Sequence, residues 1–500
     1  MTCKGKKAGV SVKFYQSTRG GARATAWEAI LEGIAPDGGL YTPEEFPPLN
    51  IEEMLGLSAM DISARVLTAL LDGFSAEEMA RIVREGYAGK FETDELTPLI
   101  KVGDAYVLEL FRGPTSAFKD VALSLLPRLM TASRDKAGAR EEIAVLTATS
   151  GDTGKAALEG FCNVPGTRIV VFYPEDGVSD VQKAQMQTQR GGNVRVCAVR
   201  GNFDDAQTGV KAIFADDREH RWAAQANTRL SSANSINLGR LAPQVAYYFK
   251  SYMDLVRRGG IAMGEEVNFV VPTGNFGDIL AGDFARRMGL PVAKLICASN
   301  ANNVLTAFIR TGLYDRRRAF HKTASPSMDI LVSSNLERYL YLESGRDAAL
   351  VARLMRELTE KGAYTAPDSV RKALSERFWA GCADDTDTFR TIARVWRELG
   401  YLLDTHTAVA WSVYERFRQQ DDNGKKTIVL ATASPYKFAA SVLTALGKAP
   451  APGFAALDEL NALTGVPVPK NLAAIRDLPV LHTDAVEKRD MLSYVKEAIR

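Results

Sequence analysis

One lysine, Lys119, lies within the apolar stretch LELFRGPTSAFKDVALSLL at residues 108–126. An amine that is shielded from water has its charged form disfavoured, so its pKa falls and it can act as a nucleophile and then carry protons. Lysines in apolar company also occur at protein surfaces, where the stem packs against apolar groups and the charge reaches water. The choice between these interpretations depends on the residues that accompany Lys119.

Two glycine-containing loops each follow an apolar run and precede a helical pattern, TGNFGDI at 273–279 and TSGDTGKAA at 149–157. Such a loop points backbone N–H groups and the positive end of a helix dipole at one place, which suits phosphate or carboxylate. In the first loop, Gly274 and Gly277 let the backbone approach an anion, and the lysine of a nucleotide-binding P-loop is absent. The second is either an ordinary helix cap or a carboxylate cradle. Its candidate residues are Ser150, Gly151, Asp152 and Thr153.

A third polar segment, ANSINLGRLAPQ at 233–244, contains Asn234, Ser235 and Arg240. Arginine favours bidentate pairing with carboxylate or phosphate, so this segment is either another anion site or a solvated loop before a helix. One lysine in an apolar setting, a phosphate loop, a polar strand end and two further anion cradles are together the parts of a pyridoxal phosphate enzyme that acts on an anionic amino acid.

The elements that must position these residues are strands alternating with helices. From about residue 96, β-branched apolar runs separated by helical stretches predict a parallel sheet covered on both faces. Three of these runs end in hydroxyl-rich loops, and ligands gather at the carboxyl ends of such strands. The runs are EIAVLTATSG, RIVVFYP, NVRVCAVRG, EVNFVVPTGNFG, AKLICAS and KKTIVLATASP.

At 500 residues the chain is too long for a single core, so several lobes are expected. We expect an N-terminal module at 1–95, a catalytic region at 96–450 and a capping segment at 451–500. Within the catalytic region we expect a smaller mobile lobe at about 120–245 and a larger lobe at about 246–450, which includes a helical insertion at 341–400.

Composition excludes several classes of function. With 62 basic and 60 acidic residues and no basic arm, the chain lacks the charge pattern of a protein that binds nucleic acid or anionic membranes. Its five cysteines are odd in number and form no CxxC pair, which argues against disulfides and structural zinc and favours the cytoplasm. No secretory h-region or membrane-length apolar run occurs.

Many segments are similar, in order and approximate spacing, to the threonine synthase family, from about residue 14 to residue 495. They are STRGG, LEGIAPDGGLYTPEEFP, ELFRGPTSAFKD, TATSGDTG, GNFDDAQ, SANSINLGRLAPQ, PTGNFGD, SPSMDILVSSNLERYL, DTHTAV and TASPYKF. The long form with an N-terminal module resembles the subgroup of enteric bacteria and fungi.

The resemblance implies the tryptophan synthase β-like α/β fold (PLP fold type II), with parallel sheets covered by helices and an added N-terminal module. It implies a lyase that converts O-phospho-L-homoserine and water to L-threonine and phosphate, by γ-elimination and β-addition, in the last step of threonine biosynthesis. Lys119 falls on the cofactor lysine. The other cofactor positions are Gly274, Asn275, Phe276, Gly277, Asp278 and, facing the pyridine nitrogen, Thr432.

For the substrate, we expect residues 150–153 to hold the carboxylate, and Asn234, Ser235 and Arg240 to hold the phosphate. We expect no metal and a monomer or homodimer. Arg112 and Thr405 depart from the family pattern, where His and Pro are common, and His406 is either a base or a structural residue. The rival functions are a phospho-lyase of the same fold, which would release a keto acid and ammonia, and an inactive regulatory relative.

Overall fold

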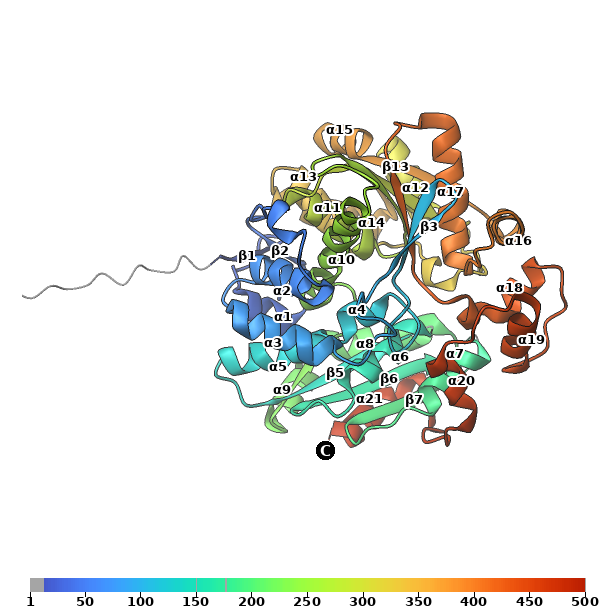
Figure 1. The fold of residues 1–500 in the computed structure, drawn as a ribbon. Coiled ribbons are helices and arrows are strands. Elements are labelled where there is room, and N and C mark those ends of the chain that lie inside the picture. Colours follow the sequence, from blue (N-terminus) through green and yellow to red (C-terminus); the bar gives the residue numbers. More distant parts are fainter. Residues whose placement is uncertain (1–12, 150, 176–177, 500) are drawn as a thin grey trace, which may run out of the picture.

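The computed structural model describes residues 13–149, 151–175 and 178–499, and Figure 1 shows two sheets of different size with an N-terminal module beside them. The module pairs β1 (Tyr15–Ser17) with β2 (Tyr41–Pro43) and adds three helices. Each helix begins at a hydroxyl residue whose side chain accepts a backbone N–H, as such caps usually do. The helices are α1 (Ala26–Glu32), α2 (Ala59–Leu70) and α3 (Ala76–Tyr87).

The larger sheet has six strands in the order β13-β10-β9-β14-β4-β3, parallel except for β3, which is antiparallel to β4. Neighbouring residues of β9 enter different cores: Phe269 packs with α11 (Gly277–Arg287), and Val270 packs with α17 (Thr405–Asp421). The central strands are apolar throughout because helices cover both faces. The strands are β3 (Leu99–Val102), β4 (Ala105–Glu109), β9 (Val267–Pro272), β10 (Val292–Ser299), β13 (Phe378–Cys382) and β14 (Thr427–Ala431).

The smaller sheet has five parallel strands in the order β15-β7-β6-β5-β8. Its edge strand β15 comes from the C-terminus of the chain. The strands are β5 (Glu142–Ala148), β6 (Thr167–Pro174), β7 (Val194–Arg200), β8 (Thr228–Ser231) and β15 (Ala485–Glu487). The helices of this half are α4 (Lys119–Leu123), α5 (Leu126–Lys136), α6 (Asp152–Phe161), α7 (Asp180–Gln187), α8 (Phe203–Ala215), α9 (Asp217–Gln225) and α21 (Met491–Ile499).

Helix α10 (Leu238–Arg257) packs against α2, α4 and α11 and so joins the module to both halves of the chain. Most of the remaining helices surround the larger sheet (Figure 1). They are α12 (Val304–Thr311), α13 (Leu336–Glu343), α14 (Ala348–Lys361), α15 (Asp368–Arg377), α16 (Asp385–Leu399), α18 (Ala439–Ala445), α19 (Ala455–Thr464) and α20 (Lys470–Ala473). A separate two-stranded antiparallel sheet pairs β11 (Leu313–Asp315) with β12 (Ala363–Thr365).

The six strands expected from apolar runs are present as β5, β6, β7, β9, β10 and β14. The stretch 341–400, expected to be helical, also contributes β13 to the edge of the larger sheet. Its sequence, FWAGC, is too short to show a strand period against its helical neighbours. The capping segment likewise adds β15 to the smaller sheet. Within the described ranges, every helix is too short or too polar to cross a bilayer.

Candidate active site

Lys119 begins α4, and its loop is attached to the end of β14 in the larger sheet. The Phe118 N–H donates to the Thr432 carbonyl at 2.8 Å, and Ala117 forms a β-bridge with Ala433. Behind the loop, the buried Asp120 carboxylate accepts from the Thr115 N–H at 2.8 Å and from its hydroxyl at 2.5 Å. The loop therefore carries Lys119 to the carboxyl end of a parallel strand, where ligands of such sheets gather.

The Lys119 side chain is buried, with 8% of the residue exposed. Its Nζ atom lies 3.6 Å from Asp152 Oδ2, 3.5 Å from Ser327 Oγ and 4.7 Å from the centre of the Phe118 ring. Burial lowers the pKa of Lys119 to about 8, although the Asp152 carboxylate opposes the shift. The surface interpretation of this lysine is therefore wrong, and the amine is available for chemistry near neutral pH.

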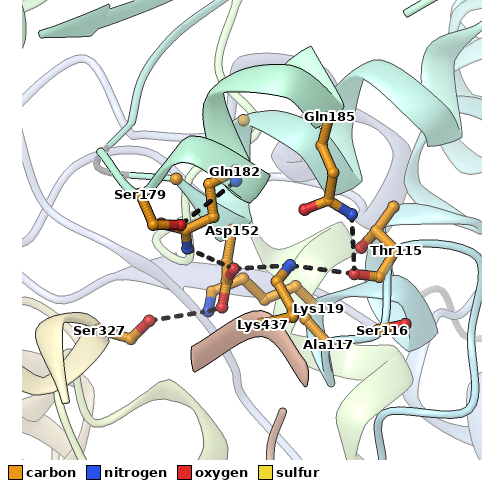
Figure 2. A network of polar contacts seen from close by, with 12 residues as sticks. Thr115, Ser116, Ala117, Lys119, Asp152, Ser179, Gln182, Gln185, Ser327 and Lys437 are labelled. Carbon is orange, nitrogen blue, oxygen red and sulfur yellow. Dashed lines mark hydrogen bonds and ion pairs between the residues drawn. The ribbon is translucent and has the colours of Figure 1, made fainter. Parts of the chain in front are cut away.

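Asp152 is the first residue of α6, and its carboxylate faces two lysines (Figure 2). Its Oδ1 atom lies 2.7 Å from Lys437 Nζ and accepts from Gln182 Nε2 at 2.9 Å. Burial alone would raise the pKa of Asp152, but Lys437 and Lys119 outweigh it and hold that pKa well below its usual range. The side chain is thus a paired anion, and a role in holding the substrate carboxylate would fall to the backbone of this loop.

Of the other residues predicted in this loop, the structure describes Gly151 and Thr153. Ser150 lies outside the described residues. Gly151 has a φ of 141°, which side chains rarely adopt, and a Cβ there would lie 2.5 Å from the Gln182 amide. Thr153 is partly exposed on the first turn of α6. The hydroxyl of Thr149 accepts from Gly151 N–H at 3.0 Å and Gly154 N–H at 2.9 Å, so Thr149 fixes the turn.

The loop between β9 and α11 is held from outside by residues that follow a short turn at 326–328. The Asn275 carbonyl accepts from the Asn335 N–H at 3.1 Å, and the Gly274 carbonyl accepts from Ser333 Oγ at 2.9 Å. Phe276 adopts a left-handed φ of 63° just before α11 begins. A Cβ at Gly274 would lie 2.7 Å from the Ser327 carbonyl oxygen. Glycine is therefore required at 274 by a close backbone approach.

Asp278, also predicted in the cofactor loop, turns its carboxylate toward α10. Its Oδ1 accepts from the Tyr248 hydroxyl at 2.9 Å and from Tyr247, while its buried Oδ2 has no hydrogen-bond partner among the described residues. Burial raises the pKa of Asp278 to about 6, although both tyrosines oppose the shift. The backbone at 278 belongs to the start of α11, and the side chain serves the contact with α10.

The segment before α10 lies against the same loop, since a Cβ at Gly277 would be 3.6 Å from Ser235 Cβ. Asn234 is partly exposed beside it. Arg240 is 5% exposed and donates to the Ala233 carbonyl at 2.7 Å, but no carboxylate lies within 4.0 Å of it in the part of the chain that the structure describes. Burial lowers the pKa of Arg240 to about 10. A buried guanidinium with one carbonyl partner has donors left for an anion.

Other candidates are already engaged with protein groups. Arg112 pairs with Glu109 at 2.7 Å and Glu92 at 2.9 Å. The two ring nitrogens of His406 contact Asp404 Oδ1 at 3.0 Å and the Ser327 N–H at 3.2 Å. These contacts favour structural roles for both. The buried Thr432 directly follows β14, and its carbonyl accepts from the Phe118 N–H of the lysine loop.

Two residues of this centre, Lys437 and Ser327, were not predicted from the sequence. Lys437, in TASPYKF, has a fully buried side chain paired with Asp152, and Ser327, in SPSMD, touches Lys119. The sequence signal for Lys437 was its place two residues after Pro435, close to the end of a predicted strand. A lysine exposed to water would fit the same sequence, so the pattern did not distinguish the two.

Comparison with known proteins assigns the chain to a family. The family model described as "Threonine synthase N terminus" matches residues 14–87, "Pyridoxal-phosphate dependent enzyme" matches 91–374 and "Threonine synthase, C-terminal" matches 407–489. The chain belongs to the threonine synthase family of pyridoxal phosphate enzymes. Its fold is the expected PLP fold type II with a family N-terminal module.

Relatives in bacteria and animals are similar over most of this chain. A threonine synthase of Pseudomonas aeruginosa is 41% identical over 87% of this chain and 91% of its own length. The crystal structure of PLP-bound threonine synthase from Brucella melitensis has a TM-score of 0.87 and 38% identity, covering 98% of this chain and all of its own. Human threonine synthase-like 1 is 39% identical over 84% of this chain, which spans 58% of that relative's length.

The residues of the centre fit pyridoxal phosphate. Ser327 touches the Lys119 amine through its hydroxyl, and its carbonyl forms the close approach at Gly274, so the amine and the phosphate loop lie on two sides of one residue. The start of α11 supplies backbone N–H groups and a positive dipole end for the phosphate. Residues 274–277 would hold the phosphate, and Lys119 would be the point of attachment.

Proposed function

We propose that this chain is a threonine synthase, which converts O-phospho-L-homoserine and water to L-threonine and phosphate with pyridoxal phosphate. The observation that carries the proposal is a buried Lys119 amine of lowered pKa near two buried cations, one of which, Arg240, lacks a carboxylate partner among the described residues. A substrate with a carboxylate and a phosphate matches that surplus of positive charge. Membership of the family supports the same substrate class.

The bound cofactor would supply an electron sink for charge that develops at the substrate carbons. The protein residues do the rest. Lys119, once released, removes the Cα proton and then moves protons at Cβ, because its pKa of about 8 suits both acceptance and donation near neutral pH. Arg240 holds the substrate phosphate in place until the bond to Cγ breaks. The backbone at 150–153 orients the carboxylate.

Exclusion of water matters until phosphate has left, because early protonation would divert the reaction. Asp152 on the smaller-sheet side and Lys437 on the larger-sheet side meet beside Lys119, so a relative movement of the two halves would change the centre directly. We propose that the lobe of residues 120–245 closes on the substrate. Structures with and without a substrate analogue that superpose without lobe movement would contradict closure.

Replacement of Lys119 tests the assignment. Lys119→Ala is expected to reduce threonine formation at least a thousandfold, because both the cofactor attachment and the proton carrier are lost. The fold should persist, since residues 274–277 and the Asp152–Lys437 pair remain. The measurements are threonine and phosphate release, with circular dichroism as the control for folding. Turnover within tenfold of the unmodified chain, or release of ammonia and a keto acid instead of threonine, would contradict the proposal.

We also propose a cytoplasmic location. Its support is compositional, since the cysteines are odd in number and lack the spacing of a disulfide framework. Fractionation of the source cells with an antibody against the chain would test it.

A further inference from the structure

Lys437 is a buried lysine with two polar partners, a carboxylate and a backbone carbonyl. It lies in a short turn, Pro435–Phe438, directly after β14, and its side chain is 0% exposed. Its Nζ lies 2.7 Å from Asp152 Oδ1 and donates to the Thr115 carbonyl at 3.0 Å. Figure 2 shows this ammonium between the lysine loop and the start of α6. One side chain thus ties together the larger sheet, the smaller sheet and the loop of Lys119.

The two oxygens of Asp152 have different neighbours. Oδ1 faces Lys437 and Gln182, whereas Oδ2 lies 3.6 Å from Lys119 Nζ. A buried carboxylate requires a compensating cation. If Lys119 were the only cation near Asp152, the amine would be held as an ammonium, which can neither attack a carbonyl carbon nor accept a proton. Lys437 supplies a second cation that stays in place while Lys119 changes its bonding.

We propose that Lys437 is a positioning residue of the catalytic centre: its buried ammonium fixes the Asp152 carboxylate across the two lobes and balances its charge, so that the Lys119 nitrogen does not have to. The inference rests on the proposed function in so far as Lys119 does the chemistry. Lys437 acts through Asp152 and does not itself touch the reacting atoms.

The charges around Lys119 agree with this arrangement. Burial lowers the pKa of Lys119, Asp152 raises it, and Arg240 and Lys437 lower it further. Asp278, on α11, also interacts with Lys119 electrostatically. Removing Lys437 deletes one cation and leaves Asp152 uncompensated, and both changes favour a positive charge on the Lys119 nitrogen.

The test is a pH titration of the visible absorption of the cofactor-loaded full chain, which reports protonation at the nitrogen joining Lys119 to the cofactor. Lys437→Met keeps the length of the side chain and removes its charge. We expect the midpoint to rise by about one pH unit or more, as for an unbalanced neighbouring charge. We expect kcat with O-phospho-L-homoserine to fall about a hundredfold with little change in KM.

Two further variants isolate the charge. Asp152→Asn should shift the absorption midpoint downward, and the double variant with Lys437→Met should return it toward that of the unmodified chain. Lys437→Arg should keep the midpoint closer to the unmodified value than Lys437→Met does. If Lys437→Met fails to fold, Asp152→Asn still decides, because an unchanged midpoint in that variant would overturn the proposal.

The chain offers a matched control in Lys250, another buried lysine with the same kinds of partner. Its Nζ lies 2.6 Å from Asp254 Oδ2 and donates to the Thr97 carbonyl at 2.6 Å. Lys250→Met should lower stability and leave the absorption midpoint unchanged. Equal shifts in the two methionine variants would mean that the midpoint follows general destabilisation, which would overturn the role of Lys437.

The outcomes separate this inference from the proposed function. A midpoint that shifts in a chain that makes no threonine would support the role of Lys437 and contradict the proposed reaction. A midpoint that stays within about 0.2 pH unit in a chain that makes threonine would support the proposed reaction and overturn the role of Lys437. A loss confined to KM for the phosphorylated substrate would make Lys437 a substrate ligand and overturn the proposal.

Discussion

Two loops of this protein have the same local design and opposite electrostatics. Each follows a buried parallel strand and has a Gly-Asp pair at the start of a helix: Gly151-Asp152 at α6 and Gly277-Asp278 at α11. In the first, Lys437 and Lys119 hold the pKa of Asp152 well below its usual range. In the second, burial raises the pKa of Asp278 to about 6. The difference comes from partners far away in the sequence.

The two loops share one sequence pattern but have different roles in the structure. The positive end of α6 already carries the protein's own carboxylate, which is paired with two lysines. The start of α11 has its carboxylate turned toward two tyrosines, which leaves the backbone N–H groups of the loop for a phosphate. A carboxylate after a glycine loop is therefore no sign by itself of which anion the loop would bind.

Arg240 would hold a third anion, the substrate phosphate, which neither of these loops is proposed to bind. Arg240→Ala should lower kcat/KM for O-phospho-L-homoserine by a hundredfold or more, about 3 kcal/mol, because a charge-assisted contact to phosphate is lost. Slow deamination of serine or threonine and the cofactor absorbance should change little. Equal losses with phosphorylated and unphosphorylated amino acids would show that Arg240 is structural.

The pH dependence of stability should differ between the two aspartates. Because the pKa of Asp278 rises from 3.8 to about 6 on folding, the folded chain holds more protons in that window, and stability falls as pH rises through it. The change is at most about 3 kcal/mol. Urea unfolding of the cofactor-free chain at pH 4.5 and 7 should show a smaller difference in Asp278→Asn than in the unmodified chain.

The contribution of Asp152 to stability should depend on pH in the opposite direction, and the same experiment tests it. Its folded pKa is depressed, so its contribution is present above the ordinary value near 3.9 and is lost only in more acidic solution. Asp152→Asn should therefore destabilise the chain at both pH 4.5 and pH 7, because it leaves Lys437 without its buried counterion. If the difference in unfolding free energy between pH 4.5 and pH 7 is the same in Asp278→Asn as in the unmodified chain, the contrast between the two loops is contradicted.

A smaller effect is expected from the backbone of the phosphate loop. Gly274→Ala places a Cβ 2.7 Å from the Ser327 carbonyl oxygen, so the loop must shift, and cofactor affinity should fall roughly tenfold. Gly56→Ala is the control, because Gly56 lies outside the loop and a Cβ there would have nothing within 4 Å. Titration of the cofactor-free chain with pyridoxal phosphate measures both. Equal affinities in the two variants would place the phosphate elsewhere.

Arg112 should give the smallest effect. Its side chain is 33% exposed and pairs with Glu92 and Glu109, so Arg112→Ala should cost about 1 kcal/mol of stability and change kcat/KM less than threefold. A hundredfold loss confined to the phosphorylated substrate would instead make Arg112 the phosphate ligand in place of Arg240. Thermal unfolding and steady-state kinetics of the same preparation provide the two readouts.

Local sequence patterns predicted six strands, the loops that follow three of them and the apolar setting of Lys119. Continuous β-branched runs can only be buried when both faces of a parallel sheet are covered, and glycines after such runs mark the turns into helices. These are local properties, so β5, β9 and β14 and the loops after them were predicted from residues adjacent in the chain. The short strands β13 and β15 were missed because edge pairing, which no short sequence pattern signals, creates them.

The charge state of the centre depends on contacts that form when the chain folds. The distance in sequence between Asp152 and Lys437 is bridged by the meeting of two sheets, and the same meeting brings Asp152 to Lys119. From the sequence alone, the lysine of TASPYKF could equally be exposed to solvent, and it is the fold that buries it. Burial and opposite charge act through space, with strength set by distance and desolvation, so a pKa is fixed only when the chain has folded.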